Sequence, residues 1–320
     1  MEYYAGIDLG GTNIKCGIVD ETGKIVCQES MPTHSEKGFS DVVSTMAELV
    51  KQLSKAVSVR VKAVGVGAPG TIDGENGVVV YSNNLAWEKV PLAAELGNEL
   101  HLPVRITNDA NAAAYGEYFC GSGKEYRSIV MLTLGTGVGS GIVIDGKLFE
   151  GNRGAGAELG HEVIRFRGEK CTCGRRGCFE AYASATALIR QTKRAMARDV
   201  DSVMWKLCSA DINNVNGRTA FDGMRLGDKA AKKVVDSYIN YLSEGVTNVV
   251  NAIRPEAVIL GGGVCAEGDA LTVPLTKKVE KSVFGGVRYA PVKILTASLG
   301  NMAGIIIGAA NLYNAPVQGQ

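Results

Sequence analysis

Two glycine-rich turns in similar surroundings constrain the fold of this chain more than any other feature of its sequence. The first lies in IDLGGTNIKCGIVDETGK at residues 7–24, and the second lies in LTLGTGVGSGIVIDGK at residues 132–147. Each turn follows a short apolar run and precedes an alternating run with a second turn, which is the pattern of a β-meander. Because the two loops align with a difference of one residue, we interpret them as a diverged internal duplication. We therefore expect two related α/β lobes.

Length and composition agree with two lobes and narrow the class of partner. A chain of 320 residues can bury a full core, and its length favours about two domains. Lys and Arg total 34 against 33 Asp and Glu, so no basic field indicates nucleic acid or a membrane surface. The first residues lack a leader pattern, and no apolar run reaches the roughly 18 residues of a membrane span. We expect a cytoplasmic protein that binds a small molecule, with no nucleic-acid or membrane partner.

Periodicity places further elements along both lobes. Apolar residues at helical spacing predict a helix over 41–53 behind a Ser40/Asp41 cap, and a longer helix over 228–253 that ends at Arg254 and Pro255. A strand at 104–107 leads into a helix from Ala110. The remaining predicted elements are a loop at 135–141, strands at 128–134, 142–144, 147–149 and 257–264, and a small-residue helix at about 301–314 before a tail at 315–320.

The two glycine turns fit neither common phosphate-binding motif, because each joins strand to strand and no Gly-Lys-Ser/Thr follows. Such turns still expose backbone N–H groups to an anion, and Thr12 and Thr136 add hydroxyls. Asp8 stands at the mouth of the first turn, where it could anchor hydrated Mg²⁺. The plainer alternatives are tight turns for both loops and, for the glycine run at 260–264, close strand–helix packing rather than a surface for a flat base.

Three cysteines cluster in HEVIRFRGEKCTCGRRGCFE, where Cys171, Cys173 and Cys178 follow His161. Three thiolates and one imidazole make a closed tetrahedral set typical of structural zinc, with no open position for a reacting water. A redox dithiol and a chance cluster are the alternatives. If His161 binds zinc through one nitrogen, its other nitrogen is fixed in orientation for a hydrogen bond elsewhere.

Taken together, seven motifs resemble the ROK family of bacterial sugar kinases, transcription repressors and related proteins, and within it the ATP-dependent glucokinases. They are DLGGTNIK at 8–15, GAPG at 67–70, NLAW at 84–87, NDANAAAYGE at 108–117, LGTGVGSGIVIDGKLFEGNRGAGAELGH at 134–161, CTCGRRGCFE at 171–180, and LGGGV at 260–264. The resemblance covers nearly the whole chain. It implies a two-lobed, actin-like and hexokinase-like duplicated fold of ribonuclease-H-like lobes with a cleft between them.

The resemblance also implies roles for individual residues. Asp109 would be the general base on the sugar hydroxyl, a role for which one positioned carboxylate suffices. The implied sugar ligands are Asn84, Asn108, Asp109, Glu158, His161 and Glu180. The implied contacts to ATP and Mg²⁺ are Asp8, Gly10, Gly11, Thr12, Asn13, Lys15, Gly135, Thr136, Gly137, Gly262 and Gly263. We place a small lobe at 1–112, with the helix of about 301–314 packed back on it, and a large zinc-containing lobe at 113–300.

The expected activity is phosphorylation of a hexose at its 6-hydroxyl, with glucose the first choice and a homodimer or tetramer as the assembly. N-acetylmannosamine, N-acetylglucosamine, allose and fructose are alternative acceptors, and polyphosphate is an alternative donor. Read singly, Asp109, Glu180 and Asn108 could be helix caps or turn residues. Two non-kinase alternatives are a non-catalytic sugar-binding module and a sugar-responsive repressor, although the latter needs a helix-turn-helix for which the residues before Asp8 leave no room.

Overall fold

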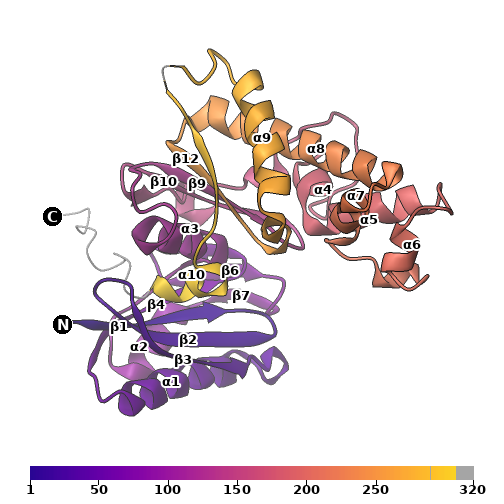
Figure 1. The fold of residues 1–320 in the computed structure, drawn as a ribbon. Coiled ribbons are helices and arrows are strands. Elements are labelled where there is room, and N and C mark those ends of the chain that lie inside the picture. Colours follow the sequence, from indigo (N-terminus) through magenta and orange to yellow (C-terminus); the bar gives the residue numbers. More distant parts are fainter. Residues whose placement is uncertain (289, 308–320) are drawn as a thin grey trace. The chain divides into compact units, whose positions relative to one another are not determined.

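The computed structural model describes residues 1–288 and 290–307 and divides into two compact units (Figure 1). Unit 1 comprises Met1–Arg127, Gly141–Ala157 and, among the described residues near the end of the chain, 298–307. Unit 2 comprises Ser128–Ser140 and Glu158–Ala297. No helix among the described residues is both long and apolar enough to cross a membrane.

Unit 1 is built on a five-stranded sheet with the order β3-β2-β1-β4-β8. Strands β1, β2 and β3 form the antiparallel meander predicted around the first glycine turn, whereas β4 and β8 run parallel to β1. The strands are β1 (Tyr3–Leu9), β2 (Asn13–Asp20), β3 (Ile25–Pro32), β4 (Val61–Ala68) and β8 (Val104–Asn108). A small antiparallel sheet of β5 (Thr71–Asp73), β6 (Val78–Ser82) and β7 (Trp87–Val90) completes the strands of this unit's first segment.

The two faces of this sheet differ in side-chain size, and the difference decides which helices they accept. Large apolar residues such as Ile7 and Val66 are fully buried on the face that receives α1 (Phe39–Ala56) and α2 (Leu92–Leu100). The opposite face carries glycines, because α3 (Asp109–Cys120) and α10 (Ala303–Ile306) approach the backbone closely. A Cβ on Gly6 would lie 1.5 Å from the carbonyl oxygen of Ile305. Asp8 is registered opposite Gly67 and shares this glycine face.

A second five-stranded sheet has the order β11-β10-β9-β12-β13, which repeats the order of the first. Its β10 and β11 pair antiparallel, and β12 pairs parallel with both β9 and β13. The predicted internal duplication is therefore confirmed at the level of topology. The strands are β9 (Ile129–Leu134), β10 (Val138–Ile144), β11 (Lys147–Leu148), β12 (Ala257–Gly261) and β13 (Lys293–Thr296).

Helices make up most of unit 2 between its strands. They are α4 (Glu180–Ala183), α5 (Ala185–Met196), α6 (Met204–Leu207), α7 (Thr219–Arg225), α8 (Lys229–Ile253) and α9 (Asp269–Ser282). Helix α8 is the predicted long helix: Asp228 caps its N-terminus, and Arg254 ends it in the left-handed region. Short 3-10 turns at Ser35–Lys37, Asn152–Gly154, Leu159–His161, Ile212–Asn214, Gly263–Glu267 and Gly300–Met302 complete the described elements.

Several element boundaries differ from the sequence-based expectation; β12, for example, ends at Gly261, before the last residues of the predicted 257–264 strand. Helix α1 starts at Phe39, not at Asp41, and its N-cap is Gly38 with no side-chain cap, so the predicted Ser40/Asp41 cap is wrong. A 3-10 turn leads straight into Gly38, whose φ of 101° suits only glycine, and Asp41 instead stabilises the first turn by its charge. The second glycine loop is shorter than predicted, because β10 already begins at Val138. Of the predicted closing helix, the part beyond residue 307 and the tail at 315–320 lie outside the described residues.

Candidate active site

The first glycine turn connects β1 to β2 and is closed by backbone bonds. The N–H of Gly10 donates to the carbonyl of Asn13 at 2.9 Å, and the Thr33 hydroxyl donates to the carbonyl of Gly10 at 2.6 Å. Thr12 and Asn13 are exposed at the tip of the turn. These bonds at Gly10 fix the backbone of the turn, while the residues at its tip face solvent, as a phosphate-binding loop requires.

Asp8 and Lys15 flank this turn as an ion pair. Lys15 Nζ lies 3.0 Å from Asp8 Oδ2, and the Asp8 side chain keeps a quarter of its surface exposed. Within the described part of the chain, Asp8 Oδ1 accepts no hydrogen bond. A partly exposed carboxylate with one oxygen to spare fits Mg²⁺, which proteins hold through one or two carboxylates together with substrate phosphates.

The carboxyl ends of three parallel strands bring Asp8 and Asp109 to one edge of the first sheet. Asp8 on β1 is registered with Gly67 on β4, and Gly67 is registered with Thr107 on β8. Asp109 follows directly after β8 as the first residue of α3, and its side chain is exposed. Loops at the carboxyl ends of parallel strands are where α/β folds bind ligands.

Asn108, not Asp109, is the N-cap of α3. Its Oδ1 accepts the N–H groups of Ala110 and Asn111 at 2.9 and 3.4 Å, and its Nδ2 donates to the carbonyl of Gly70 at 3.0 Å. Asp109 Oδ1 also accepts the N–H of Ala110, at 2.8 Å. Asn108 therefore fixes the helix start and the GAPG loop, and this arrangement orients the Asp109 carboxylate.

Asn84 lies in the turn before β7 and stands beside the first glycine turn. A Cβ on Gly11 would be 3.3 Å from both Cβ and the carbonyl oxygen of Asn84, so the two backbones are in near contact. The Asn84 residue is exposed, and its amide makes no hydrogen bond within residues 1–288 and 290–307. Unit 1 therefore gathers Asp8, Gly11 and Asn84 in one place.

In unit 2 the second glycine turn is attached to Glu180. A Cβ on Gly137 would lie only 2.1 Å from Glu180 Oε2, and the N–H of Val138 donates to that oxygen at 3.1 Å. The carbonyl of Gly135 accepts the N–H of Ala185 at 2.8 Å, while Thr136 between them is exposed. Because Glu180 begins α4, this helix and the turn form one rigid element.

The glycine run after β12 lies at the edge of the second sheet where β9 ends and the second glycine turn begins. Gly261 is registered with Thr133 near the end of β9. Gly262 has φ of 91°, and a Cβ there would lie 2.4 Å from the carbonyl oxygen of Leu134. Gly263 has no atom within 4 Å of a Cβ position, so its backbone is open to a ligand.

The segment that carries Glu158 and His161 packs on the start of β10. The N–H of Leu159 donates to the Ser140 hydroxyl at 3.1 Å, and a Cβ on Gly160 would lie 2.1 Å from the carbonyl oxygen of Val138. The Glu158 residue is exposed, whereas His161 turns toward the cysteines. The start of β10 thus contacts both the segment of Glu158 and His161 and, through Val138, the Glu180 carboxylate beside the second turn.

The predicted metal ligands come together. The ligand atoms of His161, Cys171, Cys173 and Cys178 all lie within 4.8 Å of one another, with 3.6 Å from His161 Nδ1 to Cys171 Sγ and 3.7 Å from Cys173 Sγ to Cys178 Sγ. Tetrahedral zinc with Zn–S bonds of about 2.3 Å places two sulfurs roughly 3.8 Å apart. The four residues therefore fit zinc.

The three thiols differ in how readily they lose a proton. Burial, followed by hydrogen bonds from the neighbouring thiols, raises the pKa of Cys178 to about 12, and burial also raises the pKa of Cys171. A backbone N–H from Arg175 lowers the pKa of the exposed Cys173. Thiolates at the two buried positions are costly without a nearby cation, which a divalent metal would supply.

Sequence reasoning missed two residues that position this machinery. The Thr172 hydroxyl donates to Glu180 Oε1 at 3.0 Å, which links the cysteine loop to the predicted sugar ligand. Fully buried Glu117 accepts hydrogen bonds from Ser122 N, Leu299 N and the Ser298 hydroxyl, so it ties the end of α3 to the segment before α10. The available signals were a hydroxyl between two predicted metal ligands and a carboxylate on an otherwise apolar helix.

The chain belongs to the ROK family, whose model matches residues 4–315. It is 38% identical to a glucokinase of Thermotoga maritima, with 98% of each chain covered, and 36% identical to a glucokinase of Streptomyces coelicolor, with 97% of each covered. Among solved structures, it is similar to a ROK family glucokinase from Streptomyces griseus in complex with glucose and AMPPNP, at 34% identity and a TM-score of 0.80 over 97% of this chain and 98% of that one. The fold is accordingly the two-lobed, actin-like sugar kinase fold expected from the sequence.

Proposed function

We propose that this protein is a glucokinase, which transfers the terminal phosphoryl group of ATP to the 6-hydroxyl of glucose. The observation that carries the proposal is the end-to-end similarity to glucokinases at 36–38% identity. The xylose repressors among its relatives are less similar, at 28–30% identity, and the chain covers 70–74% of their length.

Asp109 is the general base in this proposal. It is exposed at the carboxyl end of β8, and the N–H of Ala110 fixes one of its oxygens. A carboxylate so placed orients the 6-hydroxyl and accepts its proton as the bond to phosphorus forms. Phosphoryl transfer needs little other covalent help, because catalysis rests on positioning and charge neutralisation.

Side chains with complementary hydrogen-bonding capacity bind the sugar in this proposal. Asn84 offers an amide with no hydrogen bond in the described chain, and Asn108 keeps one amide hydrogen after its cap and loop bonds. Glu158 is exposed, and Glu180 accepts from Val138 N and Thr172. A sugar site built to pair each hydroxyl rejects analogues that leave a polar group unpaired.

The two glycine turns and the run at Gly262 and Gly263 bind the nucleotide in this proposal. The supporting observations are the exposed tips of both turns and the open space over Gly263. Asp8 is the proposed ligand of Mg²⁺, which would neutralise phosphate charge, and Lys15 adds a second cation at the same turn.

Zinc in the proposed Cys₃His site is structural. It would hold the cysteine loop closed and fix the orientation of His161, whose remaining nitrogen can then face the sugar. The hydrogen bond from Thr172 to Glu180 extends this rigidity to a second sugar ligand.

We further infer that the protein is cytoplasmic and forms a homodimer or a tetramer of dimers. We also infer a small lobe at 1–112, with residues of about 301–314 packed on it, and a zinc-containing large lobe at 113–300. The family resemblance and the balanced charge support the assembly and the location. Light scattering behind size-exclusion chromatography measures the assembly directly.

The activity test is nucleotide consumption with a panel of sugars. Purified protein with Mg-ATP is offered glucose, mannose, fructose, allose, N-acetylglucosamine and N-acetylmannosamine, and tripolyphosphate replaces ATP in a second series. Glucose-dependent ADP release with the highest kcat/KM of the panel is expected. A different preferred sugar or donor changes the specificity, whereas absent turnover in zinc-loaded protein would overturn the kinase proposal.

A further inference from the structure

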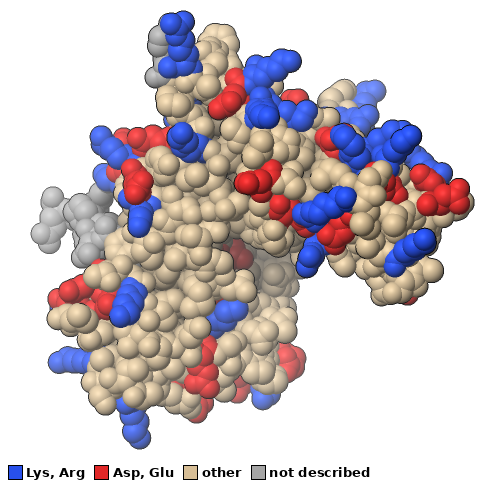
Figure 2. All heavy atoms as spheres, viewed as in Figure 1, with Lys and Arg blue, Asp and Glu red and all other residues tan. Residues whose placement is uncertain are grey.

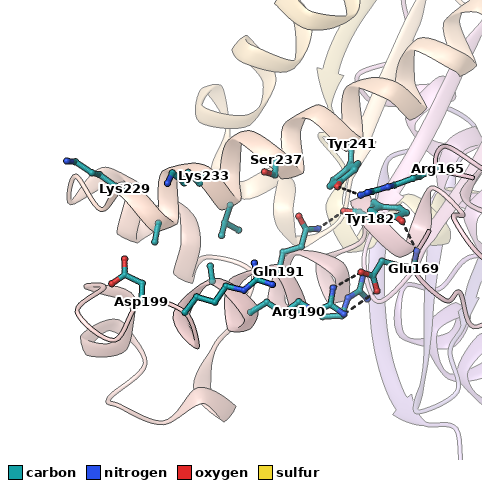
Figure 3. Close-up of a pocket in the computed structure, with 15 residues that line it drawn as sticks. Arg165, Glu169, Tyr182, Arg190, Gln191, Asp199, Lys229, Lys233, Ser237 and Tyr241 are labelled. Atoms are coloured by element: carbon teal, nitrogen blue, oxygen red, sulfur yellow. Dashed lines mark hydrogen bonds and ion pairs between the residues drawn. The ribbon is translucent and has the colours of Figure 1, made fainter. Parts of the chain in front are cut away.

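A basic cavity in unit 2 is not used by the proposed reaction. It has a volume of about 720 Å³ and lies along α5 and α8 (Figure 3). Lys229, Lys233, Ser237 and Tyr241 repeat at every fourth residue of α8, so they share the face of the helix that lines it. Figure 2 shows basic side chains, with acidic ones among them, over the helical part of this unit.

The charges of this basic pocket are strongly unequal. Two carboxylates, Glu169 and Asp199, contribute to the lining, against six cations: Arg165, Arg190, Arg194, Arg198, Lys229 and Lys233. Arg194 holds Glu169 in a two-pronged ion pair, with contacts of 2.6 and 3.2 Å. An excess of positive charge in a concave site attracts anions and is costly to leave unneutralised.

Several of these cations have donors to spare. Among the described residues, the side chains of Arg198, Lys229 and Lys233 make no hydrogen bond or ion pair. Arg190 is more constrained: one of its terminal nitrogens donates to the carbonyl of Ala181, while its Nε is buried with no acceptor. A buried donor without a partner costs free energy, so the Arg190 side chain gains stability if it shifts to meet an acceptor.

Two aromatic rings at one end of the pocket are fixed by contacts with their neighbours (Figure 3). The rings of Tyr182 and Tyr241 lie 4.5 Å apart, Arg165 donates to the Tyr241 hydroxyl at 3.1 Å, and the Tyr182 hydroxyl accepts the N–H of Glu169 at 2.6 Å. A cavity of this volume with aromatic rings and convergent charged groups suits a small organic ligand. The forked donors of arginine bind carboxylate and phosphate oxygens alike, and the surplus of six cations over two carboxylates suits a phosphate of multiple charge better than a carboxylate of single charge.

The pocket is joined by hydrogen bonds to the helix that carries the proposed sugar ligand Glu180. The carbonyls of Ala181 and Tyr182 in α4 accept from Arg190 and Gln191, and both of these donors line the pocket. Tyr182 also packs with Cys171 and Cys178. A ligand that engages Arg190 therefore acts on a short helix that begins at Glu180.

We propose that the basic pocket binds a phosphate-bearing small molecule and that its occupancy changes sugar affinity through α4; the second part rests on the proposed function. The bound phosphate oxygens accept from Arg198, Lys233 and the guanidinium of Arg190, all of which line the pocket. Two sources share this chemistry, a phosphorylated sugar and a free oligophosphate, and the probes below separate them.

The binding test is isothermal titration with glucose 6-phosphate and, separately, with tripolyphosphate, in saturating glucose and AMPPNP. Wild type is compared with Arg198→Gln/Lys233→Gln. The matched control is Lys193→Gln/Lys232→Gln, which removes the same charge from the same region at residues outside the lining. At least one probe should bind wild type, with affinity about ten-fold or more weaker in the pocket variant and changed less than about two-fold in the control.

Equal affinity for all three proteins, or no binding of either probe, overturns the proposal. If the pocket variant instead lowers the oligomeric mass and neither probe binds, the pocket is an interface between copies of the chain. The glucose KM should shift with the bound probe in wild type and not in the pocket variant. The two proposals can fail separately. If a probe binds wild type but not the pocket variant, and the protein has no kinase activity, the anion site is supported and only the proposed function is rejected.

Discussion

Gly245 lies in the middle of α8 against the ring of Phe179, and its replacement by alanine tests how firmly the site is packed. A Cβ at this position would lie 2.2, 2.4 and 2.4 Å from three ring carbons of Phe179. Favourable carbon contacts start near 3.5 Å, so the ring must move by more than 1 Å. Phe179 is only 1% exposed and stands between Cys178 and Glu180, so it has no empty space to enter and carries both neighbours with it.

Two opposing effects set the size of the change in stability. Glycine to alanine in a helix interior stabilises by about 1 kcal/mol through backbone entropy. Overpacking a closed core costs about 1–3 kcal/mol, and an overlap this deep belongs at the upper end. The expected net loss is about 1–2 kcal/mol, which lowers the melting temperature by roughly 2–8 °C for a unit of this size.

Calorimetry, zinc content and glucose KM are measured on Gly245→Ala and on a matched control. Asn248→Ala lies on an exposed position of the same helix and should stabilise by about 0.5 kcal/mol. Phe179→Leu in the Gly245→Ala background should restore part of the loss. A Gly245→Ala protein with unchanged melting temperature, zinc and KM would refute the packing argument.

Three further predictions concern other buried groups. Removal of metal by a strong chelator should lower both the melting temperature and glucose affinity, and zinc should restore them; unchanged activity in verified metal-free protein contradicts the structural role. Burial raises the pKa of the Glu150 carboxyl above 4.5, although a hydrogen bond from Thr107 opposes the shift. The charged carboxylate therefore destabilises the fold at neutral pH. This destabilisation is lost as the pH falls through the raised pKa and the group is protonated. Glu150→Gln should therefore raise the melting temperature at pH 7.5 and have no effect near pH 3.5, and a pH-independent difference refutes the assignment. Glu117→Ala should cost about 2–5 kcal/mol in urea unfolding, because it leaves the N–H groups of Ser122 and Leu299 without their acceptor; a loss below about 1 kcal/mol would show that water replaces the carboxylate.

The sequence was most informative where chemistry and backbone conformation coincide. The two meanders, the clustering of His161 with the three cysteines and the limits of α8 followed from glycine turns, from cysteine spacing and from apolar periodicity ended by Arg254 and Pro255. These features depend on residues near one another in the chain, so local rules describe them well.

Features that depend on long-range packing could not be predicted in this way. Asn108 also donates its amide to the carbonyl of Gly70, and this partner lies 38 residues away, so its hold on the GAPG loop could not be inferred from local sequence. The basic pocket joins cations from α5, α8 and the segment around Arg165, which show no common motif. Likewise, nothing local indicates that the Glu117 carboxylate would meet the backbone of Leu299.

The most direct test of the central claim compares wild type with Asp109→Asn for turnover and for glucose binding. Asparagine keeps the shape and can still accept the N–H of Ala110, but it cannot accept the proton of the sugar hydroxyl. We predict a fall in kcat of about 10²–10⁴-fold with a glucose dissociation constant within a few fold of wild type. Turnover that survives the substitution would contradict the assignment of Asp109 as the base of a sugar kinase.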